Sequence, residues 1–136
     1  MKPTCSKCNG QRVNHTNTIH PGLEKYSDIR QTGTGIWYIL FSLAYQTKIT
    51  PSKKNKEMFL HMLDMLALGL TCANCRKHFN QFMMSNPPIS AANNDQLMEW
   101  TYQCKVSADA NGGNRTIIPY DSYLNYFSSL SPKLNG

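Results

Sequence analysis

Apolar residues in the middle of the chain recur at the spacing of one face of an α-helix. Phe59, Met62, Leu63, Leu66 and Leu70 follow the i, i+3, i+4, i+7 pattern, which lets a helix bury a single stripe of its surface. No segment shows the sustained alternation of apolar and polar residues that predicts a half-buried strand. The pattern therefore predicts an all-α fold.

Breakers and capping residues divide the chain into five predicted helices. An apolar stretch starts at Ile36, after the glycines at 33 and 35, and stops before Pro51. Ser52, Thr71 and Asn93 are suited to cap the helices that follow, because their side-chain oxygens accept backbone N–H bonds. The predicted segments are 36–48, 52–68, 71–85, 93–111 and 120–130. Together they predict a four-helix bundle with a short fifth helix.

The chain of 136 residues is long enough for one domain. Residues 1–31 are polar and lack an apolar period, so we expect an irregular, flexible N-terminal arm. Residues 32–131 form the predicted folded domain, and residues 132–136 form a short tail.

Charge and hydropathy narrow the classes of partner. The net charge is +6, but the basic residues are scattered except at 53–56, which is typical of a solvated surface. The alternative interpretation of the positive charge is that it attracts an anionic cofactor or partner. No apolar run approaches the roughly 20 residues that cross a bilayer, and residues 1–5 open no signal peptide. We expect a cytoplasmic protein with no membrane or nucleic-acid partner.

Four of the five cysteines fall in two CxxC pairs, Cys5/Cys8 and Cys72/Cys75, and Cys104 is unpaired. Structural disulfides are rare in reducing compartments, so the pairs indicate metal binding or redox chemistry. A four-cysteine zinc site is one alternative. However, the gap between the pairs is far wider than the roughly 15 to 20 residues usual for zinc modules. We therefore expect no metal, and we expect Cys104 to be a buried, inert thiol.

Cys72 and Cys75 lie three residues apart at a predicted helix start, so they share one helix face. The helix N-terminus stabilises a thiolate there, which suits a disulfide that opens and closes. Thioredoxin-like surroundings, with strands and a proline after the second cysteine, are absent from the sequence. Aromatic residues on the helical faces indicate instead a flat cofactor bound between helices.

Four segments resemble the Erv/ALR flavin-linked sulfhydryl oxidases, in the same order as in that family. Residues 33–41 resemble G-R-x-x-W-x-x-L-H, and residues 72–79 match C-x-x-C-x-x-H-F. Residues 86–88 resemble a frequent N-P segment, and Trp100 resembles the tryptophan ahead of H-N-x-V-N. The resemblance spans about residues 33–130 and implies that the bundle holds FAD.

The resemblance also implies which residues contact the cofactor. They are Gly33, Thr34, Gly35, Trp37, Tyr38, Phe41, Tyr45, His78, Trp100, Lys105 and Asp109. Thr34 and Phe41 stand where the family usually has Arg and His. Lys105 and Asp109 stand at the first and last positions of H-N-x-V-N. Lys105 or Arg115 would then meet the pyrophosphate by charge.

The implied activity is oxidation of reduced protein dithiols, or of a thioredoxin-like relay protein, by dioxygen with release of hydrogen peroxide. Cys72 would be the exposed interchange sulfur of a Cys72–Cys75 disulfide, and Cys75 would lie against the flavin. Cys5 and Cys8 resemble the family's shuttle pair. The resemblance further implies a homodimer through the first two helices. The short, divergent chain is similar to oxidases of large DNA viruses, which act in host cytoplasm or virion.

The sequence is also compatible with two other functions. The first is a zinc-stabilised, non-catalytic binding module that uses both CxxC pairs. The second is an Erv-like fold that has lost FAD and serves as an interaction protein.

Overall fold

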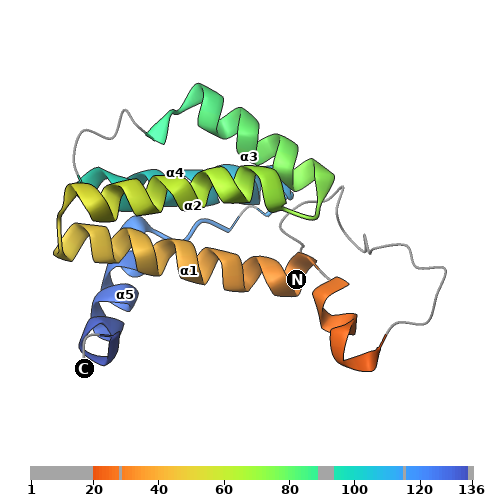
Figure 1. Cartoon of the computed structure of the whole chain (residues 1–136), viewed down its shortest axis with the longest axis horizontal. Helices are drawn as coiled ribbons and strands as arrows, with labels where there is room; N and C mark the ends of the chain where they lie inside the picture. Colours follow the sequence, from red (N-terminus) through yellow and green to blue (C-terminus); the bar gives the residue numbers. More distant parts are fainter. Residues whose placement is uncertain (1–19, 28, 89–93, 115, 135–136) are drawn as a thin grey trace.

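Helices form all the regular structure in the part of the chain that the computed structural model describes, which is residues 20–27, 29–88, 94–114 and 116–134. A short 3-10 helix, η2 (Pro21–Ser27), precedes five α-helices, coloured along the chain in Figure 1. They are α1 (Ile29–Ile49), α2 (Lys53–Gly69), α3 (Ala73–Ser85), α4 (Asn94–Asn111) and α5 (Tyr120–Leu134). The predicted all-α class is confirmed. Cys5, Cys8 and most of the predicted arm lie outside the described residues.

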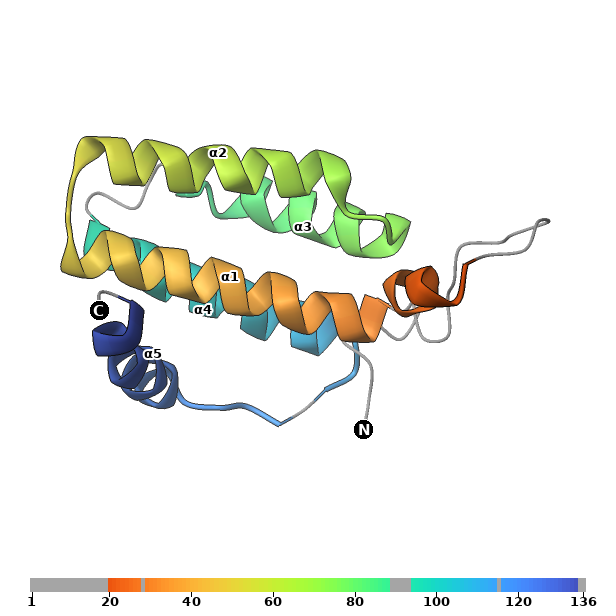
Figure 2. The ribbon, with the colours of Figure 1, turned by 60° about the horizontal axis from the view of Figure 1, so that its bottom comes forward.

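The first four helices form a closed ring around one core. α1 packs against α2 and α4, and α3 packs against the same two helices. α5 contacts α1 on the outside of this ring, as Figure 2 shows. The predicted four-helix bundle with an added fifth helix is therefore confirmed. None of the described helices combines the length and apolarity that crossing a bilayer requires.

Aromatic stacking holds α5 on the bundle. Phe41 of α1 is only 1% exposed. Its ring stacks on Tyr123 at a centroid distance of 4.5 Å and on Phe127 at 5.6 Å. Offset stacking of this kind adds about 0.5–1.5 kcal/mol to the burial of the rings. Phe41 therefore joins the bundle to the fifth helix.

The two caps in the α2–α3 region can be compared with their predictions. Ser52 caps α2 as predicted, because its Oγ accepts a 3.0 Å hydrogen bond from the backbone N–H of Asn55. The prediction that Thr71 caps α3 is wrong. Cys72 is the cap, and its Sγ accepts from the backbone N–H of Cys75 at 3.3 Å. The extended backbone of Cys72 directs its side chain over the first turn, whereas Thr71 is exposed.

Two helix boundaries also differ from the predictions. α1 begins at Ile29 and runs through Gly33 and Gly35, although a glycine inside a helix costs about 1 kcal/mol relative to alanine. Packing of α1 against η2 and α4 offsets this cost. α5 extends to Leu134, beyond the predicted end at residue 130. Local propensity therefore underestimated both helices.

Candidate active site

The Cys72/Cys75 pair lies where α2 turns into α3. Cys72 is disulfide-bonded, whereas Cys75 and Cys104 are thiols outside any disulfide. The partner of Cys72 is therefore none of the cysteines that the structure describes. The expected Cys72–Cys75 disulfide is not the state in this structure, because the Cys72 sulfur is already bonded elsewhere. Cys5 and Cys8 lie outside the described residues.

Exposure of the pair also differs from the expectation. Cys72 is 4% exposed, and Cys75 is partly buried. The expected exposed interchange sulfur is thus buried here, with the Cys72 side chain folded over the start of α3. Cys75 instead borders a cavity between the four bundle helices.

This cavity has a volume of about 80 Å³ and a mostly apolar lining. Trp37 of α1, Leu66 of α2 and Phe79 of α3 form part of its wall, and Cys75 and His78 border it from α3. Gly33 is buried at its edge, yet a Cβ there would meet no atom within 4 Å. The lining therefore suits a flat, apolar ring placed against the Cys75 sulfur.

Two larger hollows follow on the α5 side of the bundle. One of about 290 Å³ lies between α1 and α5, and Trp37 borders both it and the first cavity. The other, of about 430 Å³, is formed by α4, the segment after it and Tyr123, and Lys105 borders it together with the 290 Å³ hollow. Each larger hollow thus shares a lining residue with its neighbour, from the apolar surroundings of Cys75 to the hollow beside Asn114, whose lining is the most polar of the three.

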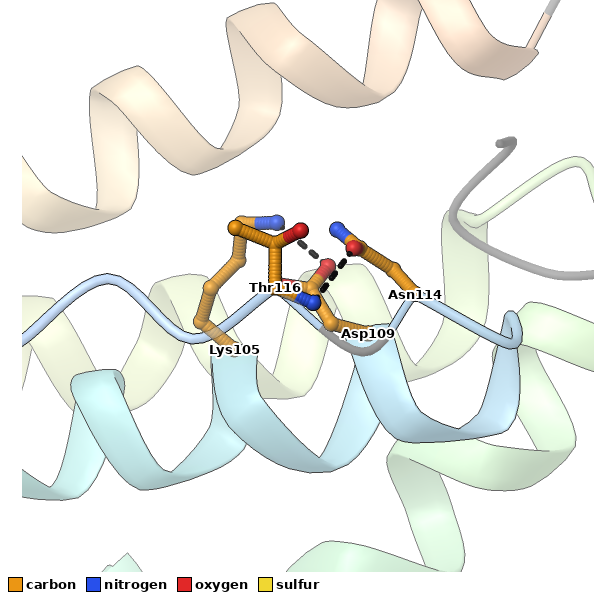
Figure 3. Close-up of polar contacts among 4 residues, drawn as sticks. All are labelled: Lys105, Asp109, Asn114 and Thr116. Atoms are coloured by element: carbon orange, nitrogen blue, oxygen red, sulfur yellow. Dashed lines mark hydrogen bonds and ion pairs between the residues drawn. The ribbon is translucent and has the colours of Figure 1, made fainter. Parts of the chain in front are cut away.

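Lys105 places a cation beside both larger hollows. The Nζ atom of Lys105 is 2.6 Å from Oδ1 of Asp109, and both side chains are largely buried, at 17% and 15% exposed. Nζ also lies 5.5 Å from the centroid of the Trp37 ring. Figure 3 shows Lys105 and Asp109 beside Asn114, whose Oδ1 accepts from the backbone N–H of Thr116 at 3.0 Å. An ammonium and nearby amides suit the phosphates of a dinucleotide.

The remaining residues expected to contact the cofactor divide into two sets. Thr34, Tyr38 and Phe41 line the 290 Å³ hollow. Gly35, Tyr45 and Trp100 line none of these three hollows. Trp100 packs edge-on against Phe82, with centroids 5.4 Å apart, and its Nε1 donates to the backbone carbonyl of Asn86 at 2.8 Å. Trp100 therefore packs against Phe82, which itself lines the 80 Å³ cavity.

Several residues of the region were not identified from the sequence. Leu66 and Leu70 line the 80 Å³ cavity from α2, and Tyr123 borders both larger hollows from α5. The i, i+3, i+7 spacing of Tyr120, Tyr123 and Phe127 is the signal that would have placed α5 aromatics against the bundle.

Burial raises the pKa of two ionisable groups beside these hollows. It raises the pKa of the Cys104 thiol from 9.0 to about 12, so this cavity-lining sulfur stays protonated. Burial, with smaller effects from the Asp109 carboxylate and Tyr102, raises the pKa of Tyr123. Cys104 is therefore the buried thiol that the sequence predicted. Within the described ranges, no three His, Cys, Asp or Glu side chains gather where a metal ion could bind.

Comparison with known families agrees with this arrangement. The profile of the Erv1 / Alr family matches residues 34–112, which is more than half of the chain and includes Trp37, Cys72, Cys75 and Lys105. Comparisons with curated proteins and with solved structures gave no significant match. This match, on a helical bundle in which Cys75 of the CxxC pair borders an apolar cavity, shows that the chain belongs to the Erv1 / Alr family.

Proposed function

We propose that this protein is an FAD-dependent thiol oxidase that forms disulfide bonds in substrate proteins. One observation carries the proposal: Cys72 is engaged in a disulfide with a cysteine other than Cys75, while the Cys75 thiol lies at the wall of an apolar cavity. The two sulfurs of one CxxC pair thus occupy different environments, as their different roles require. The membership in the Erv1 / Alr family supports the same reading.

The residues present fit FAD along the three adjoining hollows. Trp37, His78 and Cys75 would surround the ring end, because they border the apolar cavity. Lys105 and Asn114 would meet the phosphate end, because both line the 430 Å³ hollow, the most polar of the three. When bound there, FAD supplies the two-electron chemistry that links a dithiol to dioxygen, with hydrogen peroxide as the product.

The cysteine pair performs the thiol exchange. A substrate thiolate attacks Cys72 in a Cys72–Cys75 disulfide, which forms a mixed disulfide at Cys72 and releases Cys75 as a thiolate. A second substrate thiolate then attacks the substrate sulfur of the mixed disulfide, so the substrate leaves oxidised and Cys72 leaves as a thiolate. Loss of two electrons from the Cys72/Cys75 pair to dioxygen, which bound FAD would link, would then restore the Cys72–Cys75 disulfide, so the net reaction would be 2 R–SH + O2 → R–S–S–R + H2O2. A Cys72 disulfide beside a Cys75 thiol is the bonding expected at the mixed-disulfide stage, which supports this sequence of steps.

The partners follow from this chemistry. Reduced protein dithiols or a thioredoxin-like relay protein would supply electrons, and Cys5 and Cys8 would carry them to Cys72. A homodimer through α1 and α2 is part of the proposal, because Ile39 and Leu43 of α1 and Met65 of α2 are exposed apolar side chains. Light scattering of the purified chain measures that assembly directly.

Colour and oxygen uptake test the main proposal. The purified protein should show flavin absorbance and consume oxygen when dithiothreitol is added. Cys75→Ser should abolish uptake and keep the flavin band, whereas Thr71→Ala should retain activity because Thr71 is exposed and caps no helix. A colourless protein with stoichiometric zinc would instead support the zinc-stabilised module, and a folded chain with neither group would support the Erv-like fold without FAD.

A further inference from the structure

Arg76 binds both ends of the three-residue corner that carries Cys72. Its backbone N–H donates to the carbonyl of Cys72 at 2.9 Å. Its guanidinium Nη1 donates to the carbonyl of Leu70, the C-terminal cap of α2. The segment 70–72 is therefore held by main-chain and side-chain donors of one residue.

Asn80 reinforces this contact one turn further along α3. Its Nδ2 donates to the carbonyl of Ala67 in the last turn of α2 at 3.2 Å, and to the carbonyl of Arg76 at 2.9 Å. The last carbonyls of a helix have no partner within the helix, and a cation there is favourable for the helix dipole. Arg76 and Asn80 thus fasten the end of α2 to the start of α3.

This attachment has a consequence for the sulfur of Cys72. The Sγ atom accepts from the backbone N–H of Cys75 at 3.3 Å only while Cys72 keeps its position at the start of α3. Stabilisation of a thiolate by a helix N-terminus falls off within one turn. A looser corner would therefore weaken that stabilisation without any loss of a group that touches the sulfur.

We propose that Arg76, supported by Asn80, is a positioning residue that holds the Cys72 sulfur over the first turn of α3 and thereby sets its reactivity in thiol exchange. The proposal rests on the proposed role of Cys72 as the exchange sulfur. Neither side chain makes a described contact with a sulfur, so each acts through the backbone of residues 67–72. Lys77, the next residue, is exposed and carries the same charge, which makes it a matched control.

The test measures the reduced, full-length chain. Iodoacetamide is added at neutral pH, and the alkylation rate of Cys72 is followed by peptide mass spectrometry. Arg76→Met should lower this rate about threefold to tenfold, the range expected when one helix-capping contact is lost. Arg76→Lys should recover most of the rate, and Lys77→Met should leave it unchanged. The glutathione equilibrium of the Cys72–Cys75 pair should shift toward the disulfide by a similar factor in Arg76→Met.

Asn80→Ala should reduce the rate less than Arg76→Met does, and it provides the measurement if Arg76→Met folds poorly. Three results would overturn the proposal. The first is an unchanged alkylation rate of Cys72 in Arg76→Met, and the second is an equal loss of rate in Lys77→Met. The third is a rate that correlates only with the urea unfolding midpoint across all variants, because overall stability would then explain the change. Neither flavin nor oxygen enters the assay. A failure here is therefore distinguishable from a failure of the proposed oxidase activity.

Discussion

The ammonium of Lys105 lies between the ring of Trp37, whose centroid is 5.5 Å away, and the carboxylate of Asp109, at 2.6 Å. One cation thus joins α4 to α1 and lines both the 290 Å³ and the 430 Å³ hollows. Asp109 neutralises this charge, and it would oppose any anion that approaches Lys105. The two side chains should therefore have opposite effects on a phosphate-bearing ligand.

Replacing Lys105 should weaken nucleotide binding. In Lys105→Met, affinity for FAD and for ADP should fall about tenfold or more, because a charge-assisted contact contributes roughly 1.5–3 kcal/mol. Asp109→Asn should bind ADP at least as tightly as the unaltered chain, because the opposing carboxylate is removed. Titration calorimetry at low and high salt gives both values. Equal affinity in Lys105→Met and the unaltered chain would contradict the placement of the phosphates.

The two glycines inside α1 provide a matched pair. A Cβ at Gly33 or Gly35 would meet no atom within 4 Å, so alanine at either position should raise the free energy of unfolding by roughly 0.5–1 kcal/mol. Only Gly33 borders the 80 Å³ cavity. Gly33→Ala should therefore weaken FAD binding, and Gly35→Ala should not. Urea unfolding and flavin titration separate the two effects, and equal FAD affinities would argue against a cofactor beside Gly33.

Cys104 should make the fold less stable at high pH. Its pKa is raised by burial to about 12, from 9.0, so the unfolded chain loses this proton first as the pH rises. The stabilising contribution is complete below pH 9 and is lost as the pH rises toward 12. The loss has a limiting slope of about 1.4 kcal/mol per pH unit.

Cys104→Ala should remove this part of the decline, so its unfolding free energy should vary less with pH above 9. Tyr123→Phe should also reduce the decline, because the pKa of Tyr123 is raised in the same direction. Urea denaturation at a series of alkaline pH values measures the slopes. Parallel curves for Cys104→Ala and the unaltered chain would show that Cys104 titrates normally.

Truncation of Phe41 should release α5 as well as open the core. Phe41 is 1% exposed and stacks on two α5 rings, so Phe41→Ala should cost about 3–5 kcal/mol of unfolding free energy. Tyr126→Ala, which alters an α5 side chain that is 54% exposed, should cost less than about 1 kcal/mol. Hydrogen exchange across residues 120–134 should rise in the first variant alone. Unchanged exchange there would mean that other contacts hold α5.

Local sequence patterns predicted correctly those features that depend on a single helix. The apolar period at Phe59 and Leu63 predicted α2, and both residues are buried. The capping serine at 52 and the buried thiol at Cys104 follow from local rules in the same way. The helical start at Ile29 could not be predicted, because packing against η2 and α4 outweighs the helix penalty of the glycines at 33 and 35.

The sequence by itself determined the all-α class, the position of the CxxC pair at a helix start, and the motifs that match the Erv1 / Alr family. These depend on residue type and on spacing along one helix. Only the tertiary structure decided that Cys75 borders the cavity with Trp37, that Lys105 lies between Trp37 and Asp109, and that Arg76 fastens the corner carrying Cys72. Contacts between helices depend on how the helices pack, and that packing is set by the whole core at once.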